Sequence, residues 1–380
     1  MKSFRDINIV FPDGVRKGSI TFDERSILSF EASENALSLP EGVYLAPGFL
    51  DEHIHGACGR DAMDGDPESI LKIADALVQE GVTSFLPTTM TETIPAIEKS
   101  LLSIQEAKKK QTSGANIAGI HLEGPFISPI FKGAQAEINI QKPNPALLER
   151  FQKLSGGLIR IVTFAYEEDG GEEFLKACLR LNITPSLGHS NATGQEALAS
   201  FDKGVTSVTH LYNAQSRFHH RDIGIVGATL LRDGVKAEII ADFHHSSKEA
   251  IALLCKTKRK EDIVLISDST EAKGLGEGAK AKLGSQEIHV QNGLALLENG
   301  TIAGSILRID DALRNVSSVA KGYSYSDIVN LAALNPAKSL RLDGRLGSIA
   351  IGKEPSFSLL DSSFHVLATI VNGTVAYRKP

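Results

Sequence analysis

Two histidines, His53 and His55, end an apolar run that reads GFLDEHIHG over residues 48–56. In an extended strand, side chains two residues apart point to the same side, so these two imidazoles face one way and Ile54 faces the other. Two imidazoles that converge at a strand end can share a metal ion, or they can be hydrogen-bonded histidines of a protein core. The residues at other strand ends distinguish between these two interpretations.

Histidine and acidic residues also follow other apolar runs of strand length. Six of eight such runs end in histidine, glutamate or aspartate, namely at His53 and His55, His121 and Glu123, His189, His210, Asp242 with His244 and His245, and Asp268. One histidine at a strand end is more often structural, but this recurrence is not expected by chance. Imidazole and carboxylate ligands without thiolate suit a catalytic zinc, iron or manganese ion with open coordination positions. The sequence therefore predicts that His53 and His55 belong to a divalent-metal site.

A metal site of this composition favours hydrolysis. A divalent ion lowers the pKa of bound water towards neutrality and polarises a scissile carbonyl group. A carboxylate close by must then take the proton of the water and pass it to the leaving group. Asp268, at the end of the last run, is the candidate for this role, and its alternative role is to cap the next helix or turn.

The runs that end in these residues alternate with helical patterns. The eight runs cover residues 49–53, 84–88, 117–123, 158–164, 184–189, 207–211, 236–241 and 263–268. Between the first two, Ile70, Ile73 and Leu77 recur at intervals typical of one helix face. Eight strands, each followed by a helix or loop, predict an α/β fold of the (β/α)8 TIM type, whose carboxyl strand ends share one face and carry the site. A doubly wound sheet is the alternative, but no glycine-rich dinucleotide turn follows the first strand.

Both ends of the chain are rich in short strand patterns. Such patterns fill residues 1–46 and return over residues 346–380, where Asn372-Gly373 predicts a hairpin turn. We expect the two ends to meet in a small β-sandwich domain formed by residues 1–46 with 346–380. Residues 47–345 then form the catalytic barrel.

Composition excludes several classes of protein. The chain has 380 residues, a formal net charge of -6 and a pI of about 6.0, which argues against a nucleic-acid binder that works through a basic surface. The three cysteines lie far apart without C-x-x-C spacing, so a disulfide scaffold or cysteine zinc site is not expected. The N-terminal stretch lacks the apolar core of a signal peptide, and no apolar run approaches the roughly 18 residues of a membrane span. We therefore expect a cytoplasmic protein without a membrane partner.

Longer motifs surround the candidate ligands. They are PGFLDEHIHG (47–56), GVTSFLPTT (81–89), HLEGPFISP (121–129), GHSNAT (188–193), THLYNA (209–214), HHR (219–221), SD (267–268), GTIAGS (300–305), NPA (335–337) and LGSIAIGK (346–353). Over nearly its whole length the chain thereby resembles the N-acetylglucosamine-6-phosphate deacetylase family of the amidohydrolase superfamily, and the combination of HLEGPF with THLYNA is specific to that family. The broader superfamily often bridges two ions with a carboxylated lysine of the fourth strand. That strand, LIRIVTFA, has no lysine here, and Glu123 resembles its substitute.

The resemblance implies a metal-dependent hydrolase of amino-sugar catabolism, which converts N-acetylglucosamine 6-phosphate to glucosamine 6-phosphate and acetate. Glu123, His189 and His210 would hold the principal ion. His53 and His55 would permit a second ion, as in family members with H-x-H at this position. The implied cofactor is therefore one or two divalent ions of zinc, iron or manganese. Asp268 would act first as general base and then as general acid.

The resemblance also implies how the amino-sugar phosphate is bound. The residues that would contact the substrate are Gln135, Asn213, the backbone of Ala214, Arg221, His245 and Ile302. Arg221 would bind the phosphate, in the family often across a dimer interface, so a homodimer is implied. Its planar guanidinium suits phosphate recognition. His245 would polarise the acetamide carbonyl or contact the substrate.

Some residues depart from the family pattern around the sugar. The seventh strand leads into Asp242-Phe243-His244-His245 where the family usually has D-G-x-H, so His244 could be the functional histidine instead of His245. Phe243 replaces a glycine, and a different backbone path is expected there. These changes leave open the galacto epimer, N-acetylgalactosamine 6-phosphate, as the substrate. A cyclic-amide or ureido amidohydrolase and a non-catalytic sugar-phosphate-binding homologue are further alternatives.

Overall fold

Eight parallel strands form a nearly closed barrel in the computed structural model, which describes residues 1–380. They are β6 (Phe49–Ile54), β9 (Val82–Thr89), β11 (Ile120–Glu123), β12 (Ile159–Phe164), β13 (Thr184–Leu187), β14 (Ser207–Val208), β15 (Lys236–Ile240) and β16 (Ile263–Ile266), and a short strand β10 (Asn116–Ile117) pairs with β9. Consecutive strands pair in parallel from β6 to β16. The ring closes where the backbone N–H of Asp268 donates to the carbonyl of His53 over 2.9 Å. The predicted (β/α)8 barrel is confirmed.

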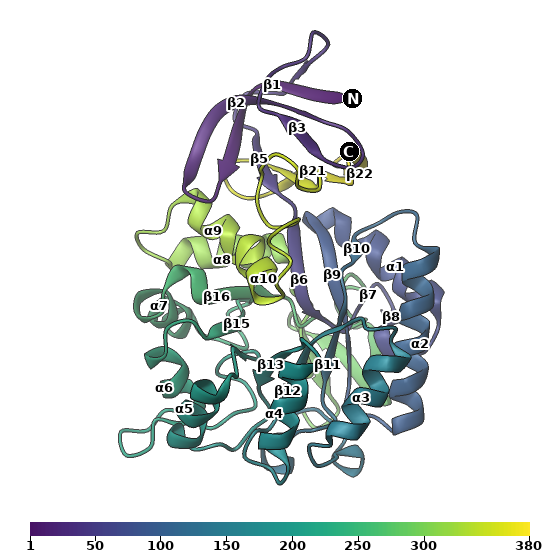
Figure 1. Ribbon diagram of the computed structural model, residues 1–380, viewed down its shortest axis with the longest axis vertical. Coiled ribbons are helices and arrows are strands. Elements are labelled where there is room, and N and C mark those ends of the chain that lie inside the picture. The colour runs from purple at the N-terminus through teal and green to yellow at the C-terminus, as the bar shows by residue number, and fades with distance from the viewer.

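Helices lie around the outside of the barrel (Figure 1). They are α1 (Pro67–Leu77), α2 (Ile94–Lys110), α3 (Pro145–Leu154), α4 (Gly171–Arg180), α5 (Gly194–Lys203), α6 (Gly224–Leu231), α7 (Lys248–Thr257), α8 (Ile309–Val319), α9 (Tyr325–Ala332) and α10 (Leu334–Ser339). In α1, Ile70, Ile73 and Leu77 are buried, as their spacing predicted. The strands β9 and β16 are buried along their whole length, which is expected of parallel strands covered by helices. None of the helices combines the length and apolar character needed to cross a bilayer.

Short elements shape the loops between strands and helices. They are the strands β7 (Gly56–Ala57) and β8 (Arg60–Asp61) and the 3-10 turns η1 (Ala62–Asp64), η2 (Val78–Glu80), η3 (Pro129–Phe131), η4 (Glu137–Asn139) and η5 (Lys260–Asp262). Side-chain caps fix where several helices begin. Asp66 caps α1, and Thr193 with Glu196 forms a capping box at α5. The cap at α5 therefore limits the loop that follows His189 to a few residues.

A second sheet joins both ends of the chain at the end of the barrel where β6 begins (Figure 1). Its strands are β1 (Lys2–Phe11), β2 (Gly14–Phe22), β3 (Ile27–Ser29), β4 (Leu37–Ser38), β5 (Tyr44–Pro47), β20 (Phe357–Leu360), β21 (Val366–Val371) and β22 (Thr374–Arg378). β5 pairs with β20, and the rings of Phe22 and Phe357 lie 5.1 Å apart in its core. Asn372 and Gly373 both have positive φ, as a tight hairpin turn between β21 and β22 requires. We propose residues 1–46 with 346–380 as a separate domain, because they supply nearly all of this sheet.

A third sheet follows the last barrel strand and was not predicted from the sequence. It consists of β17 (Lys280–Leu283), β18 (Gln286–Gln291) and β19 (Leu294–Leu297), which pair in antiparallel order. The turn between β17 and β18 contacts the loop after β9, where the backbone N–H of Ser285 donates to Glu92 Oε1 over 2.9 Å. The signal that could have revealed it is the Asn292-Gly293 dipeptide between two short apolar patterns.

Gly48 joins the terminal sheet to the barrel, since it lies between β5 and β6. A Cβ atom at this position would lie 2.7 Å from Cβ of Thr83 and would overlap the rest of that side chain. We expect Gly48→Ala to reduce the free energy of unfolding by about 1–3 kcal/mol, the usual cost of overpacking. Gly344→Ala is the control, because a Cβ there would meet nothing within 4 Å. The midpoints of thermal unfolding measure both effects, and equal midpoints would contradict this account of Gly48.

Candidate metal centre

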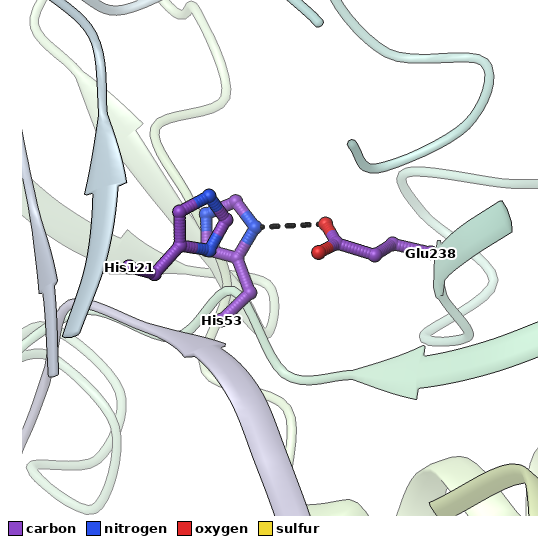
Figure 2. A group of neighbouring side chains, drawn as sticks. All are labelled: His53, His121 and Glu238. Atoms are coloured by element: carbon purple, nitrogen blue, oxygen red, sulfur yellow. Dashed lines mark hydrogen bonds and ion pairs between the residues drawn. The ribbon is translucent and has the colours of Figure 1, made fainter. Parts of the chain in front are cut away.

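His53 lies at the end of β6, and its imidazole is held by a second buried side chain. Its Nδ1 lies 3.0 Å from Oε2 of Glu238, a residue of β15 (Figure 2). An ionised carboxylate accepts hydrogen bonds and cannot donate them, so Nδ1 of His53 carries the proton. Nε2 of His53 is therefore the ring nitrogen that faces the cluster, and this buried atom has no hydrogen-bond partner. His53 is thus oriented as a metal ligand would be.

Two of the other three imidazoles present Nε2 in the same way, whereas Nδ1 of His210 has no hydrogen-bond partner. Nδ1 of His55 lies 3.1 Å from the carbonyl oxygen of Thr88, and Nδ1 of His189 lies 2.9 Å from that of Phe131. A carbonyl oxygen only accepts, so both rings donate from Nδ1 and direct Nε2 towards the cluster. Nε2 of His210 lies 3.1 Å from Nε2 of His189. Support of the far ring nitrogen by a carbonyl or carboxylate is usual for metal-binding histidines.

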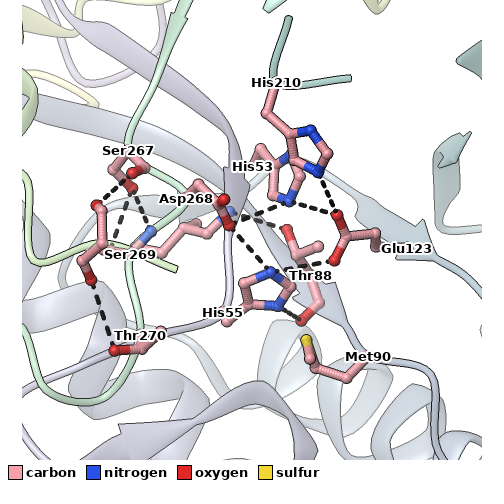
Figure 3. Close-up of polar contacts among 12 residues, drawn as sticks. His53, His55, Thr88, Met90, Glu123, His210, Ser267, Asp268, Ser269 and Thr270 are labelled. Carbon is pink, nitrogen blue, oxygen red and sulfur yellow. Dashed lines mark hydrogen bonds and ion pairs between the residues drawn. The ribbon is translucent and has the colours of Figure 1, made fainter. Parts of the chain in front are cut away.

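The four Nε2 atoms converge on the carboxylate of Glu123, at the end of β11. Figure 3 shows this for His53, His55 and His210. Glu123 Oε1 lies 3.1 Å from Nε2 of His210 and 3.2 Å from Nε2 of His189. The same oxygen lies 3.4 Å from Nε2 of His53, and Oε2 lies 3.3 Å from Nε2 of His55. These buried residues form two overlapping groups that could each hold an ion, one with His189 and His210 and one with His53 and His55.

Asp268 lies beside the second of these groups, directly after β16. Its Oδ1 lies 3.2 Å from Nε2 of His55 and 3.4 Å from Nε2 of His53 (Figure 3). Asp268 has a φ of 47°, His189 also has 47° and His210 has 30°, although residues with a Cβ rarely adopt positive φ. Three functional candidates at the strand ends therefore have strained backbones, which the surrounding structure must hold in place.

The charges of the cluster fit a divalent cation. Burial raises the pKa of Glu123, but the neighbouring His53 and the hydrogen bonds from His189 and His210 lower it by more, so that it lies well below its usual range. Burial likewise opposes the ionisation of Asp268, yet His53 and His55 lower its pKa to about 2. Burial opposes a charge on His53 and His55, yet Asp268 and Glu123 raise the pKa of His53 well above its usual range and that of His55 to about 9. Without an ion the cluster therefore pairs ionised carboxylates with protonated rings, and a divalent cation could take the place of the ring protons. Such a set of nitrogen and oxygen donors without thiolate fits zinc, iron or manganese.

His121 lies next to this cluster but is not placed as a ligand. Its ring packs against that of His53, with 4.4 Å between the ring centroids. Nδ1 donates to the carbonyl of Glu52 over 3.1 Å, and Nε2 lies 2.7 Å from the hydroxyl of Thr163. Burial lowers the pKa of His121 well below its usual range. Both nitrogens of this neutral ring are therefore occupied, and it supports His53 by packing.

A cavity of about 300 Å³ opens over the cluster of candidate metal ligands. It is lined by His55, Met90, Glu123, Gly133, Ala134, Gln135, His189, His210, Asn213, Ala214, His244, His245, Asp268, Leu283, Ile302 and Gly304. The predicted substrate contacts Gln135, Asn213, Ala214 and Ile302 are all among these residues. Leu283 comes from the third sheet, so that sheet forms part of the wall.

Gln135 lies in the cavity wall and contacts the cluster of candidate metal ligands. Its Nε2 donates to Oε2 of Glu123 over 2.7 Å, and its Oε1 accepts from the backbone N–H of Thr91 over 2.7 Å. Both bonds require the same orientation of the amide group. Gln135 therefore orients the carboxylate of Glu123 in this structure, whereas the sequence predicted only a contact with substrate.

His245 and His244 both line the cavity, but their surroundings differ. Nδ1 of His245 lies 2.6 Å from Oδ2 of Asp242, and Oδ1 of Asp242 accepts the backbone N–H groups of His244 and His245 at 2.8 Å each. Burial opposes protonation of His245, yet the bond to Asp242 raises its pKa. His244 is exposed. Phe243 has a φ of 65°, so it keeps a conformation that glycine favours, and the expected change of backbone path is not needed.

Arg221 does not reach the cavity within this chain. It lies exposed in the loop between β14 and α6, and its side chain makes no ion pair. Its backbone N–H donates to Nδ1 of His219 over 3.3 Å. A role for Arg221 in phosphate binding would therefore need a second copy of the chain or a movement of this loop.

Three supports of the cluster were missed in the sequence. Glu238 lies inside the predicted strand 236–241, and a charged residue in such an apolar run is itself a signal, because charged residues are rarely buried without a partner. The carbonyl groups of Thr88 and Phe131 carry no side-chain signal at all. Backbone acceptors of this kind depend on the fold and are not readable from residue types.

Glu123→Gln is expected to lose the metal, because a neutral amide replaces the one carboxylate shared by both ligand groups. Metal content per chain after dialysis, measured by elemental analysis, tests this. Asp242→Asn is the matched control, since Asp242 lies at the same face but contacts His245 rather than the cluster. A Glu123→Gln protein that retains the wild-type metal content would contradict the assignment.

The chain is similar to known proteins over most of its length. A sequence profile described as the Amidohydrolase family matches residues 44–376. The chain is 38% identical to the N-acetylglucosamine-6-phosphate deacetylase of Bacillus subtilis (strain 168) over 91% of this chain and 88% of that protein. It is 36% identical to the N-acetylgalactosamine-6-phosphate deacetylase of Escherichia coli O157:H7 over 87% of each chain. The crystal structure of N-acetylglucosamine-6-phosphate deacetylase from Thermotoga maritima superposes with a TM-score of 0.90 at 35% identity, over 99% of this chain and 100% of that one. The chain belongs to the amidohydrolase family.

Proposed function

We propose that this protein is a metal-dependent hydrolase that removes the acetyl group from N-acetylglucosamine 6-phosphate and releases glucosamine 6-phosphate and acetate. The observation that carries the proposal is the convergence of four imidazole Nε2 atoms on Glu123, with Asp268 beside them, at the base of one cavity. Relatives that share more than a third of this sequence are named as deacetylases of this class of sugar phosphate.

Glu123, His189 and His210 would hold the principal ion, and His53 and His55 would complete a second position with Glu123. A divalent ion bound there would lower the pKa of water and polarise the acetamide carbonyl. We propose zinc, iron or manganese, with one or two ions per chain. The protein would hold the ligand atoms in fixed positions around the ion, because three of the four imidazole rings are oriented by a hydrogen bond at Nδ1.

Asp268 moves the proton in the proposed reaction. An ionised carboxylate at this position is the form that a general base requires. Asp268 takes a proton from the attacking water at its carboxylate and then delivers it to the nitrogen of the departing amino sugar. The C–N bond of the amide breaks as the new C–O bond of acetate forms, so no other reactant is needed.

The remaining cavity residues would bind the sugar phosphate. Asn213, the Ala214 backbone and Ile302 would contact the substrate, and we assign polarisation of the acetamide to His245 because Asp242 holds its ring against the cavity. Arg221 of a second copy would bind the phosphate, which is the basis for proposing a homodimer. A cytoplasmic location agrees with three free cysteines and with a sugar-phosphate substrate.

The galacto epimer is the second candidate substrate, because one close relative is named for it. Purified protein is incubated with each 6-phosphate epimer, and free acetate is measured over time. We expect acetate from the gluco epimer at a higher kcat/KM than from the galacto epimer. Release from the galacto epimer alone would retain the chemistry and replace the substrate, and no acetate from either would contradict the proposed function.

Asp268→Asn tests the proton transfer. We expect the variant to bind the substrate and the metal but to lose roughly three or more orders of magnitude in kcat, because general acid–base catalysis typically contributes about 10²–10⁴-fold. Single-turnover acetate release and substrate binding by calorimetry measure the two effects separately. Asp262→Asn, at the opposite end of β16, is the control. A variant of Asp268 with wild-type kcat would exclude this role.

A further inference from the structure

We propose that Glu238 is a positioning residue that links the two ligand groups of the metal centre and sets the affinity of the His53–His55 position. The inference rests on the proposed function, since it concerns the same metal centre. Glu238 lies on β15, is fully buried, and is absent from the cavity wall, so it cannot contact substrate.

One oxygen of Glu238 contacts both ligand groups. Oε2 accepts from Nδ1 of His53 at 3.0 Å and from the backbone N–H of His210 at 3.2 Å (Figure 2 shows the first of these). His53 belongs to the group with His55, and His210 belongs to the group with His189. Glu123 connects the two groups through the Nε2 atoms of their rings. Glu238 connects them on the opposite side, through Nδ1 of His53 and the backbone N–H of His210.

Glu238, His53 and His121 lie close enough together to hold an ion, but both nitrogens of His121 are already hydrogen-bonded, so the contacts of Oε2 best explain a carboxylate at this place. Glu238 makes no ion pair with lysine or arginine, and its second oxygen, Oε1, has no partner at all. Burial of an unpaired carboxylate is costly, and an apolar side chain of similar size would pack in a barrel interior without that cost. The contacts of Oε2 are therefore the reason for a glutamate here.

The bond to His53 has a defined consequence for metal binding. It fixes the tautomer with the proton on Nδ1, directs Nε2 towards the ion, and makes that nitrogen more basic. Loss of such an outer carboxylate typically lowers metal affinity by about 10–100-fold. Glu238 contacts His53 through its ring but His210 only through its backbone. The loss should thus fall mainly on the His53–His55 position.

Zinc titration of metal-stripped protein against a chromogenic chelator tests the inference. The variants are Glu238→Gln, which keeps the shape, and Glu238→Ala, which removes the contact. Glu52→Gln is the matched control: Glu52 is also a buried acid of the barrel interior, but its side chain contacts Ser339 and no ligand ring.

We expect wild-type protein and Glu52→Gln to bind two zinc ions per chain. Glu238→Gln should bind the first ion with nearly unchanged affinity and the second about 10–100-fold more weakly, and Glu238→Ala should lose the second ion. Equal affinities in all four proteins would overturn the inference. A wild-type protein that binds one ion would also overturn it but would leave the proposed hydrolase intact, whereas a wild-type protein that binds none would contradict the proposed function itself.

A second measurement needs no variant of Glu238. In zinc-loaded wild-type protein with ¹⁵N-labelled histidine, the nitrogen shifts of His53, identified by comparison with His53→Asn, report which ring nitrogen carries the proton. We expect a protonated Nδ1 with a strongly hydrogen-bonded proton. A ring protonated at Nε2 would overturn the inference, even if the Glu238 variants failed to fold.

Discussion

The buried carboxylate of Glu123 is the interaction on which the site depends. Four imidazoles approach it through Nε2, from strand ends that are up to 157 residues apart in the chain, between His53 and His210. A buried carboxylate is costly unless it is compensated. Protonated rings can compensate for it, and so can a divalent cation that shares the same donors. A divalent cation would leave the hydrogen bonds at Nδ1 unchanged. Three of the four rings, those of His53, His55 and His189, have such a bond to a fixed acceptor.

The barrel is what makes this convergence possible. Parallel strands in a closed ring place all carboxyl ends on one face, so each strand can contribute one or two side chains to a common point. The positive φ angles of His189, His210 and Asp268 show that the chain leaves regular strand geometry at these positions. The helices, and the terminal sheet at the opposite end, stabilise the barrel without entering the cavity.

Much of this arrangement could be predicted from residue types. The apolar runs locate all eight barrel strands, because this signal is local. Five of the histidines and acids at their ends, His53, His55, Glu123, His189 and His210, lie together in the structure. Glu238 was missed since its role depends on a partner 185 residues away in the chain. The third sheet was missed because its strands are short and partly exposed. The position of Arg221 outside the cavity also could not be predicted, because loop conformation depends on contacts that no local pattern encodes.

The most direct test of the metal centre is anomalous diffraction from crystals of the zinc-loaded protein, collected on both sides of the zinc absorption edge. The account predicts a zinc peak bounded by Glu123, His189 and His210, within coordination distance of their oxygen and Nε2 atoms. A map with no peak at this cluster, or with bound zinc only elsewhere on the protein, would contradict it.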